Sequence, residues 1–501
     1  MTVKNLCFLC QEICNRQCSY CEVYFCADNH FESHRNDGHC LPYTICVNPK
    51  SGRHFEATRD ISAGETILVD EASVVGPATK TEPLCLECFK SLDKVSKKSL
   101  CKCGFYLCIE CINLNGGHHE LECNQIQTTA KHILEMDDGL YKKLEYACVF
   151  LLRFWMLRKY NPVIWNRLNL LSSGETKDLE KTKFVEDMVK VMQVKLGAKD
   201  ITSQDVHQMM GIKRTNASNL SSIGLDGANA LYPTYTLMNS HCYCNSRSTI
   251  DPKTFQMRVN ANRDIKSGEE ISTRYVTVLE GQPRRRNLIW SGWKFICECE
   301  RCEDPTEFGT YFSAIKCLKC SSGFVLQKSS NGLASPWMCE SCQKSYGNLE
   351  IQNIVDNLEV RIHAHQSNTT SLSSPHSFIL ETLEEQVHPS HFLVVGLKNK
   401  FFFHSYIQNI SKKFFDGLNE EEINHLNNKM KEQIKYGYQI LSLVETFDPG
   451  YSNHKGTILK QLATLKMQFA KLRFCITKDQ SEYNDHMGSS MEMIKSIALC
   501  I

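Results

Sequence analysis

Residues 227–245 read GANALYPTYTLMNSHCYCN, and residues 257–275 read MRVNANRDIKSGEEISTRY. The second segment alternates apolar with polar residues and contains the sequence R-D-I-x-x-G-E. Residues 51–72, SGRHFEATRDISAGETILVDEA, contain a second copy, with its turn at Gly64 and Glu65. Alternation, β-branched residues and a glycine turn are typical of strands joined by a hairpin. Both copies therefore predict strand and hairpin structure.

Cysteines are unusually frequent, with 27 in 501 residues, and most fall in short pairs interleaved with histidines. Thiolates two residues apart can bind one face of a tetrahedral zinc ion, and a further pair completes the site. His34, His39 and Cys40 are three candidates for the last two ligands of the first cluster. Adjacent side chains such as His39 and Cys40 rarely bind one ion, so we take His34 with Cys40 and keep His39 as the substitute. The ligands predicted for this cluster are Cys7, Cys10, Cys18, Cys21, Cys26, His30, His34 and Cys40.

A second cluster combines seven cysteines with a histidine. His118 is an alternative to His119, but only His119 lies one helical turn before Cys123. If successive pairs of ligands along the chain bind the two ions alternately, each ion has four ligands. The first set is Cys85, Cys88, Cys108 and Cys111, and the second is Cys101, Cys103, His119 and Cys123.

Two further sets follow the strand segments. Cys297, Cys299 and Cys302 are one ligand short of a closed site. Cys317, Cys320, Cys339 and Cys342 have the spacing of a four-thiolate zinc ribbon around a hairpin that contains glycine and serine. A catalytic zinc usually keeps an open position, whereas each set can fill four, so we expect structural zinc.

Composition excludes other classes. With 57 basic and 56 acidic residues the net charge is +1, which creates no general attraction for nucleic acid. The fingers also lack the spacing that presents a DNA-reading helix, so we expect no sequence-specific DNA binding. The first residues, MTVKNLCFLC, have no apolar signal run, and the apolar stretch 147–157 is broken by Arg153. We therefore expect an intracellular protein without a membrane segment.

The C-terminal part contains few cysteines and has helical periodicity. Apolar residues at Ile458, Leu462, Leu465, Phe469 and Leu472 are three or four positions apart, which places them on one face of a helix. Helix pairs separated by residues 367–375 and 447–456 predict a TPR-like stack.

These features, in this order, resemble the SET and MYND domain family of protein-lysine methyltransferases, in its arthropod-type branch. The two R-D-I-x-x-G-E turns resemble the opening and closing parts of a SET domain, and the second cysteine cluster resembles a MYND zinc finger inserted between them. The family's L-Y-P followed by N-H-S-C-x-P-N corresponds to LYP at 231–233 and NSHCYCN at 239–245. The resemblance implies an α+β multidomain protein with a β-rich SET domain split by the MYND finger, additional small zinc modules and a C-terminal TPR-like helical domain.

The resemblance also implies domain boundaries. They are an N-terminal MYND-like finger over 1–45, the first SET part over 46–84, the MYND finger over 85–123, a helical SET insert over 124–205, the SET core over 206–280, a post-SET zinc site over 281–304, a zinc ribbon over 305–345 and the helical domain over 346–501.

Site residues are implied in the same way. Tyr275 corresponds to the catalytic tyrosine that orients the substrate amine and the methyl group, and Cys242 to the fourth post-SET zinc ligand. The implied cofactor contacts are Arg53, His54, Phe55, Asn216, Asn239, Ser240, Tyr275 and Phe295. The sequence departs from the family where Ser240 replaces a histidine, where His54 replaces a glycine and where Trp293 replaces a second channel tyrosine.

The implied activity is transfer of a methyl group from S-adenosylmethionine to a lysine of a histone or another protein. The implied cofactors are S-adenosylmethionine and Zn²⁺. Partner proteins would bind the MYND finger and the C-terminal helices, the protein would be a monomer, and it would act in the nucleus and cytoplasm as a chromatin regulator. The alternative is a weakly active or inactive scaffold that binds protein partners, with a role in transcriptional regulation.

Overall fold

The structure is a computed structural model. It describes residues 7, 10, 12–17, 24–36, 41–49, 51–79, 81–95, 97–115, 120–127, 139–174, 183–328, 335–368, 375–403 and 419–500. Four predicted zinc ligands lie outside these ranges, namely Cys18, Cys21, Cys40 and His119, as do the alternative candidates His39 and His118. The backbone of His34 is described, but its side chain is not.

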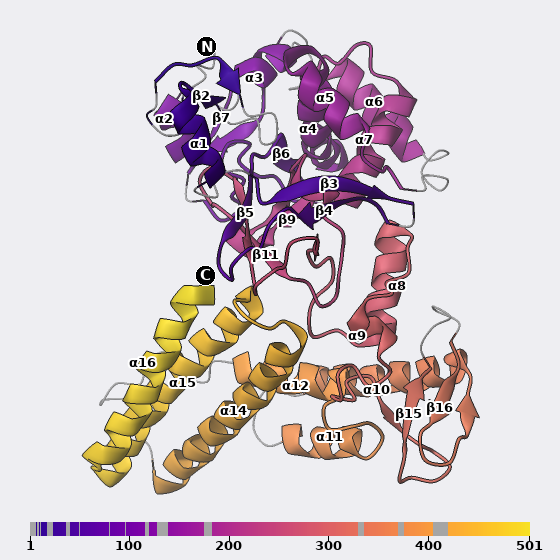
Figure 1. The fold of residues 1–501 in the computed structure, drawn as a ribbon, viewed down its shortest axis with the longest axis vertical. Coiled ribbons are helices and arrows are strands. Elements are labelled where there is room, and N and C mark those ends of the chain that lie inside the picture. The colour runs from indigo at the N-terminus through magenta and orange to yellow at the C-terminus, as the bar shows by residue number, and fades with distance from the viewer. Residues whose placement is uncertain are drawn as a thin grey trace.

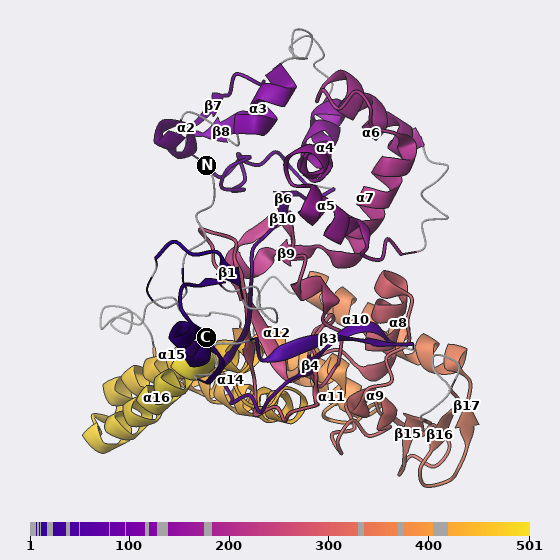
Figure 2. The ribbon, with the colours of Figure 1, turned by 45° about the horizontal axis from the view of Figure 1, so that its top comes forward.

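The chain forms a β-rich centre with helices above and below it (Figures 1 and 2). The strands are β1 Arg16–Gln17, β2 Tyr24–Phe25, β3 Tyr43–Asn48, β4 Gly52–Ala57, β5 Thr66–Asp70, β6 Val74–Pro77, β7 Lys98–Leu100, β8 Tyr106–Cys108, β9 Ser218–Leu220, β10 Leu225–Leu231, β11 Ser246–Ile250, β12 Met257–Ala261, β13 Glu270–Ile271, β14 Ile315–Lys316, β15 Phe324–Gln327, β16 Trp337–Cys339 and β17 Ser345–Tyr346.

The helices are α1 Asp28–Asn36, α2 Ile109–Asn115, α3 Glu120–Gln127, α4 Gly139–Tyr160, α5 Pro162–Asn169, α6 Lys183–Val194, α7 Ser203–Asn216, α8 Gln282–Trp293, α9 Glu300–Glu303, α10 Asn348–Asn368, α11 Pro375–Glu384, α12 Phe392–Phe403, α14 Glu420–Phe447, α15 Asn453–Thr477 and α16 Gln480–Cys500, with short 3-10 turns η2 Ser221–Ile223 and η3 Tyr235–Leu237.

Three small antiparallel sheets join segments that lie far apart in the sequence. Their strand orders are β13-β4-β3, β11-β12-β5 and β6-β10-β9. Each of the early strands β4, β5 and β6 pairs with a late strand, so residues 81–216 form an insertion between two halves of one β unit. Apolar side chains from both halves share one core that contains Phe55, Leu68, Ala230 and Val259. The burial of this shared apolar surface is what stabilises the split unit.

The two R-D-I-x-x-G-E turns bind each other reciprocally. Ile61 and Ile265 exchange both backbone hydrogen bonds, each 2.9 Å long. Asp264 Oδ1 accepts from the backbone N–H of Ala63 at 2.8 Å, and Asp60 Oδ1 accepts from Ser267 at 3.0 Å. The turn glycines have φ angles of +87° at residue 64 and +82° at residue 268, a region in which other residues are strained. The two copies of the repeated sequence therefore form a pseudo-symmetric pair of turns that holds the early and late parts of the β unit together.

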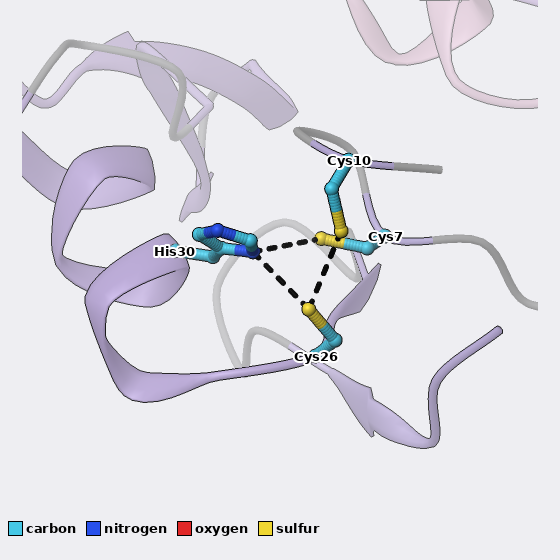
Figure 3. A group of neighbouring side chains, drawn as sticks. All are labelled: Cys7, Cys10, Cys26 and His30. Atoms are coloured by element: carbon cyan, nitrogen blue, oxygen red, sulfur yellow. Dashed lines mark hydrogen bonds between the residues drawn. The ribbon is translucent and has the colours of Figure 1, made fainter. Parts of the chain in front are cut away.

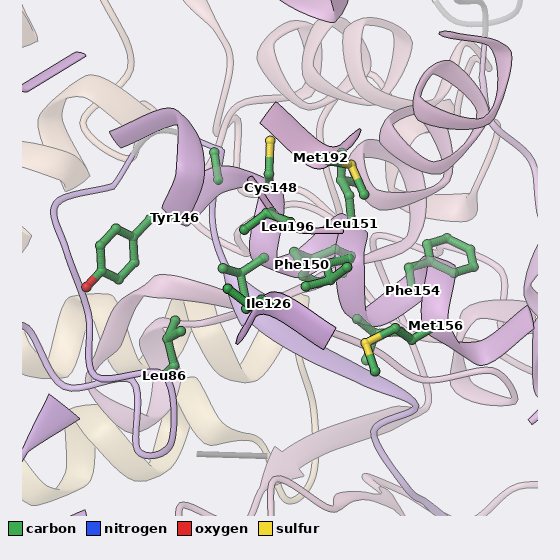
Figure 4. Close-up of a cluster of buried hydrophobic side chains, with 14 of the residues drawn as sticks. Leu86, Ile126, Tyr146, Cys148, Phe150, Leu151, Phe154, Met156, Met192 and Leu196 are labelled. Carbon is green, nitrogen blue, oxygen red and sulfur yellow. The ribbon is translucent and has the colours of Figure 1, made fainter. Parts of the chain in front are cut away.

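Helix α4 forms the centre of the inserted part. Its side chains from Tyr146 to Leu152 are buried on every side, together with Phe154, as expected for a helix that is apolar all round (Figure 4). They pack against α3, α6 and α7 and against the cysteine-rich finger. Arg153 is accommodated because its guanidinium pairs with the fully buried Glu122 and donates to the carbonyls of Val75 and Leu86 at 2.6 and 2.8 Å.

Helix α8 links the β unit to the ribbon and to the C-terminal helices (Figure 1). Strands β14 to β17 form a four-stranded antiparallel ribbon, and α10, α11 and α12 follow it. Helices α14, α15 and α16 are long neighbours in a layer of their own (Figures 1 and 2). The predicted apolar face of α15 is buried between α12, α14 and α16. Whether this layer is a TPR-like stack stays a prediction.

Residues 448–453, between α14 and α15, dock onto the β unit. Tyr451 N–H donates to Asn262 O at 2.9 Å, and Arg247 Nη1 donates to Tyr451 O at 2.7 Å. Asn453 Nδ2 donates to Ser248 O at 3.0 Å. The C-terminal helices are therefore anchored directly on strands β11 and β12. Across the described ranges, every helix is too short or too polar to span a bilayer.

Candidate functional site

At least five groups of predicted ligands, four of which have four members, have their ligand atoms within 4.8 Å of one another. In the most buried group, Cys242 Sγ lies 3.8 Å from Cys297 Sγ and 3.6 Å from Cys302 Sγ, with Cys299 completing the set. Hydrogen bonds from these three thiols hold the pKa of Cys242 well below its usual value, which favours the thiolate, the form that binds zinc. The structure thus brings a cysteine from the 227–245 segment to the three that follow α8.

The finger contains a second complete group, Cys85, Cys88, Cys108 and Cys111. Cys88 Sγ lies 3.8 Å from Cys108 Sγ, and a hydrogen bond from Cys88 lowers the pKa of Cys85 to about 4. A second set in the finger gathers Cys101, Cys103 and Cys123, with 3.5 Å between the first and last sulfur atoms. Its predicted fourth ligand, His119, lies outside the described residues.

The N-terminal module gathers Cys7, Cys10, Cys26 and His30 (Figure 3). Cys26 Sγ lies 3.1 Å from His30 Nδ1 and 3.4 Å from Cys10 Sγ. This grouping pairs the first Cys-x2-Cys with the Cys-x3-His, and leaves Cys18, Cys21, His34 and Cys40 as the predicted second site. The imidazole nitrogen and the three sulfur atoms all point toward one another, as in a tetrahedral metal site.

The ribbon contributes the last group, Cys317, Cys320, Cys339 and Cys342. Cys317 Sγ lies 3.6 Å from Cys342 Sγ, and Cys320 Sγ lies 3.7 Å from Cys339 Sγ. In all four complete groups the donor set is four thiols, or three thiols and one imidazole, with no ligand position left open. These sets fit structural zinc.

Tyr275 lies where two segments of the later half of the β unit run side by side. Thr273 donates its N–H to Asn239 O at 2.9 Å, and His241 donates to Thr273 O at 2.8 Å, so residues 239–241 run beside residue 273. The Tyr275 hydroxyl donates to Met238 O at 2.9 Å. Burial raises the pKa of Tyr275 further above neutrality, so its hydroxyl keeps its proton.

Trp293, the last residue of α8, joins Tyr275 to α7. The two rings have centroids 4.7 Å apart at an interplanar angle of 37°. Trp293 Nε1 donates to Thr215 O at 2.8 Å, beside the predicted cofactor residue Asn216. Residues from four parts of the sequence therefore meet at one place.

Asn216 and Arg53 reach the same neighbouring segment. Asn216 Nδ2 donates to Ser172 O at 2.8 Å and to Ile212 O at 2.9 Å, and Arg53 Nη2 donates to Leu170 O at 2.8 Å. The residues that follow α5 thus position both side chains, a role for residues 170–172 that no sequence motif predicted.

The neighbouring residues Asn239 and Ser240 differ in their hydrogen bonding. Asn239 Nδ2 donates to Glu270 Oε1 at 2.8 Å. Ser240 Oγ is buried and has no hydrogen-bond partner among the described residues, and the same is true of Thr215 Oγ1. Buried hydroxyls without a partner are uncommon in native proteins and indicate a place where a polar ligand or water can bind.

Three other predicted cofactor residues lie differently. The Phe55 side chain is fully buried in the core and stacks on Tyr43 at 4.1 Å, so only its backbone remains accessible to a ligand. His54 is partly exposed on β4, with Nδ1 3.4 Å from Gly52 O. Phe295 is 37% exposed, two residues before Cys297.

Sequence reasoning missed Asp70, which positions the LYP segment. Its Oδ2 atom accepts from the backbone N–H groups of Thr234 and Tyr235, both at 2.8 Å. Burial raises the pKa of this carboxyl. The sequence signal that could have identified Asp70 is an aspartate at the end of the apolar strand TILVD. A charge buried at such a position needs hydrogen-bond donors.

A family model described as "SET domain" matches residues 52–276. SET domain-containing protein SmydA-8, isoform A, of Drosophila melanogaster is 23% identical over 435 residues, which cover 85% of this chain and 88% of that protein. N-lysine methyltransferase SMYD2-A of Xenopus laevis is 22% identical over 273 residues, covering 52% and 61%.

Histone-lysine N-methyltransferase SET5 of Candida albicans is 25% identical over 307 residues, covering 52% of this chain and 63% of that protein. A crystal structure of the SET domain of LSMT bound to lysine and AdoHcy covers 89% of this chain and 92% of its own, at 11% identity. Its TM-score is 0.30, too low for this likeness to inform the fold or the ligand.

Proposed function

We propose that the chain, whose residues 52–276 match the SET domain model and which is similar to SmydA-8 and SMYD2-A, is a protein-lysine N-methyltransferase that uses S-adenosylmethionine. The observation that carries the proposal is the convergence at Tyr275. The Tyr275 hydroxyl contacts Met238, its ring contacts Trp293, and Trp293 contacts Thr215 beside Asn216. Tyr275 is thus connected to the chain neighbours of Asn239 and Asn216.

The unpaired hydroxyls fit the proposed cofactor. S-adenosylmethionine has a carboxylate, an ammonium and a ribose, which can satisfy buried groups such as Ser240 Oγ and Thr215 Oγ1. Asn216, Asn239 and the backbone at Arg53 to Phe55 would bind its polar parts, and Phe295 would contact its adenine. When bound, it supplies an electrophilic methyl group.

Tyr275 would orient the substrate amine. Its hydroxyl proton is directed to Met238 O, so the lone pairs of its oxygen remain available to accept an N–H from the lysine. Because the phenol is neutral, this contact adds no negative charge that would favour the protonated, unreactive ammonium. Alignment of the amine with the methyl group is expected to supply most of the rate.

The zinc sites would act structurally. The group at Cys242 fixes the segment after Asn239 against the segment that carries Phe295 and Trp293, so metal binding there would assemble the cofactor side of the site. The finger and the C-terminal helices would present surfaces to protein partners, and we propose nuclear and cytoplasmic action on histones or other proteins.

The test is incubation of the zinc-loaded protein with isotopically labelled S-adenosylmethionine, first with core histones and then with a nuclear protein extract. Mass spectrometry should find labelled methyl groups on lysine. A protein that binds the cofactor but labels no lysine in either pool would argue against the enzyme.

A second candidate function is a partner-binding scaffold with an inactive site. The observation that favours it is that side chains of the site already contact other protein atoms. Asn239 is bonded to Glu270, Asn216 is bonded to two carbonyls, and the Trp293 ring contacts Tyr275 where the family has a second tyrosine. The two candidates differ in cofactor binding, because the scaffold needs none.

A further inference from the structure

A cavity lies between residues of α8, the ribbon and α10. These three elements are neighbours in Figure 2. The volume of the cavity is about 310 Å³. Apolar walls come from Pro283, Trp337, Val355 and Phe392. Ligand sites are typically concave, mostly apolar and equipped with a few polar groups, and their volumes begin near this size.

Three buried side chains line this cavity with an unpaired polar atom each. They are Arg286 Nη1, Gln327 Oε1 and His391 Nε2, and none of them has a hydrogen-bond partner among the described residues. The residues are only 1%, 6% and 0% exposed, respectively. Leaving a buried polar atom unpaired costs on the order of 1–3 kcal/mol, so three in one cavity indicate an occupant.

The other atoms of these side chains define the role of each free atom. Gln327 Nε2 donates to Ser335 O at 3.2 Å, so the unpaired Oε1 is an acceptor. His391 Nδ1 accepts from the backbone N–H of Leu393 at 3.3 Å, so the neutral ring carries its proton on Nε2 and donates there. Burial lowers the pKa of His391 to about 3, which keeps the ring neutral.

The charge of Arg286 is already balanced. Its Nη2 donates to Glu303 Oε1 at 2.7 Å and its Nε donates to Cys297 O at 3.2 Å, while Nη1 remains a free donor. On the rim, Arg284 pairs with Glu359 at 2.9 Å. The three unpaired atoms are therefore two donors and one acceptor, and each of the two lining arginines has a carboxylate partner.

We propose that this cavity is a binding site for a neutral ligand that carries an amide group next to a small apolar group. An amide carbonyl has two lone pairs for the two donors, and an amide N–H matches the acceptor. A carboxylate fits less well, because it has no proton for Gln327 Oε1. Water alone could satisfy the polar atoms, but it would also wet the walls formed by Trp337 and Phe392, which costs free energy.

The amide could belong to a free small molecule or to the main chain of a peptide. N-acetyl-leucinamide represents the first source. The same residue within the acetylated, amidated peptide Ala-Ala-Leu-Ala-Ala represents the second. A peptide site binds the longer probe at least as tightly, whereas a small-molecule site excludes it. N-acetyl-leucine, which ends in a carboxylate, tests the amide requirement.

Binding is measured on the zinc-loaded full chain by titration with each probe, followed by protein NMR or by the tryptophan fluorescence to which Trp337 contributes. The account predicts saturable binding of one or both amides and weaker binding of the acid. Gln327→Met, which removes the free acceptor, should weaken amide binding roughly tenfold. The proposal is overturned if neither amide binds up to its solubility limit, or if N-acetyl-leucine binds as tightly.

Two exposed positions on α8 supply a matched pair of variants that spare the core. Asn287 lines the cavity, whereas its neighbour Leu288 does not and is 44% exposed. Asn287→Trp should abolish probe binding by filling the cavity, and Leu288→Trp should leave it unchanged. Equal affinity in the two variants would place the binding elsewhere and reject this site.

Discussion

The guanidinium of Arg274 lies 2.8 Å from the carboxylate of Asp448, and a second pair of their atoms lies 2.9 Å apart. The two side chains are 12% and 2% exposed. This buried ion pair joins the residue before Tyr275 to the start of the loop that connects α14 with α15. The position of Tyr275 is thus coupled to the C-terminal helices.

Removal of one partner should expose this coupling. Asp448→Asn leaves the Arg274 charge buried without a counter-ion, and we expect a loss of unfolding free energy on the order of 3 kcal/mol. Glu445→Gln is the control, because Glu445 pairs with Lys455 at 2.9 Å but is 49% exposed. It should cost under about 1 kcal/mol. Urea denaturation distinguishes the two, and equal midpoints would contradict the assigned role of Asp448.

Tyr275→Phe removes only the hydroxyl that is proposed to orient the amine. Affinity for S-adenosylmethionine should hold while turnover falls on the order of 10²-fold, the pattern of an interaction made mainly in the transition state. Tyr232→Phe is the matched control, since that hydroxyl also donates to a backbone carbonyl, Phe255 O at 2.7 Å. If both variants lose turnover equally, Tyr275 acts only through stability.

Asn239→Ala should weaken cofactor binding before it affects the chemical step. The substitution removes a polar partner of the ligand and frees Glu270 Oε1 from its present donor. A loss of about 1–3 kcal/mol in binding free energy is expected. Calorimetry of the variant checks this, and unchanged affinity would remove Asn239 from the cofactor site.

Zinc content tests the cysteine clusters. Elemental analysis should find about four to six zinc ions per chain, as the four-ligand sets require. Cys302→Ser should lose one zinc and loosen the segment around Cys242, whereas Cys475→Ser, which lies outside the groups, should keep the full content. Two or fewer zinc ions in the wild type would refute the ligand assignment.

Buried Lys213 predicts a pH-dependent stability. Burial lowers its pKa to about 7, against about 10.4 in the unfolded chain. Between these values the unfolded chain binds a proton that the native state does not, so the stability contributed at Lys213 falls as the pH falls from about 10 toward 7.

Lys213→Met should remove this term, so its stability relative to the wild type should be higher at pH 7 than at pH 9, by a difference on the order of 2 kcal/mol. Exposed Lys199→Met is the control and should show no such change. A gap between Lys213→Met and the wild type that is equal at both pH values would contradict the burial argument.

Local sequence patterns predicted the features that depend on residues close together in the chain. The described Cys-x2-Cys pairs and the apolar face of α15 are patterns within a few residues, and the structure contains them. The two glycine turns are also present, but the predicted hairpins are wrong, because β4 and β5 lie in different sheets, as do β12 and β13. The reciprocal bonds of Asp60 and Asp264 were not foreseen, because they join turns that lie far apart in the chain.

Local sequence patterns also did not predict the long-range contacts that build the site. The bonds from Trp293 to Thr215 and from Arg53 to Leu170 depend on how α5, α7 and α8 pack, and no spacing encodes that packing. The side chain of Phe55 lies in the core because alternate residues of β4 face inward, so its predicted cofactor contact is one for the backbone.

Calorimetric titration of the zinc-loaded wild-type protein with S-adenosylmethionine tests the central claim most directly. The account predicts saturable heat with the stoichiometry of a single site, and loss of affinity in Asn239→Ala. A wild-type protein that is folded, contains its zinc and yet gives no binding heat at millimolar S-adenosylmethionine would contradict the methyltransferase and leave the scaffold.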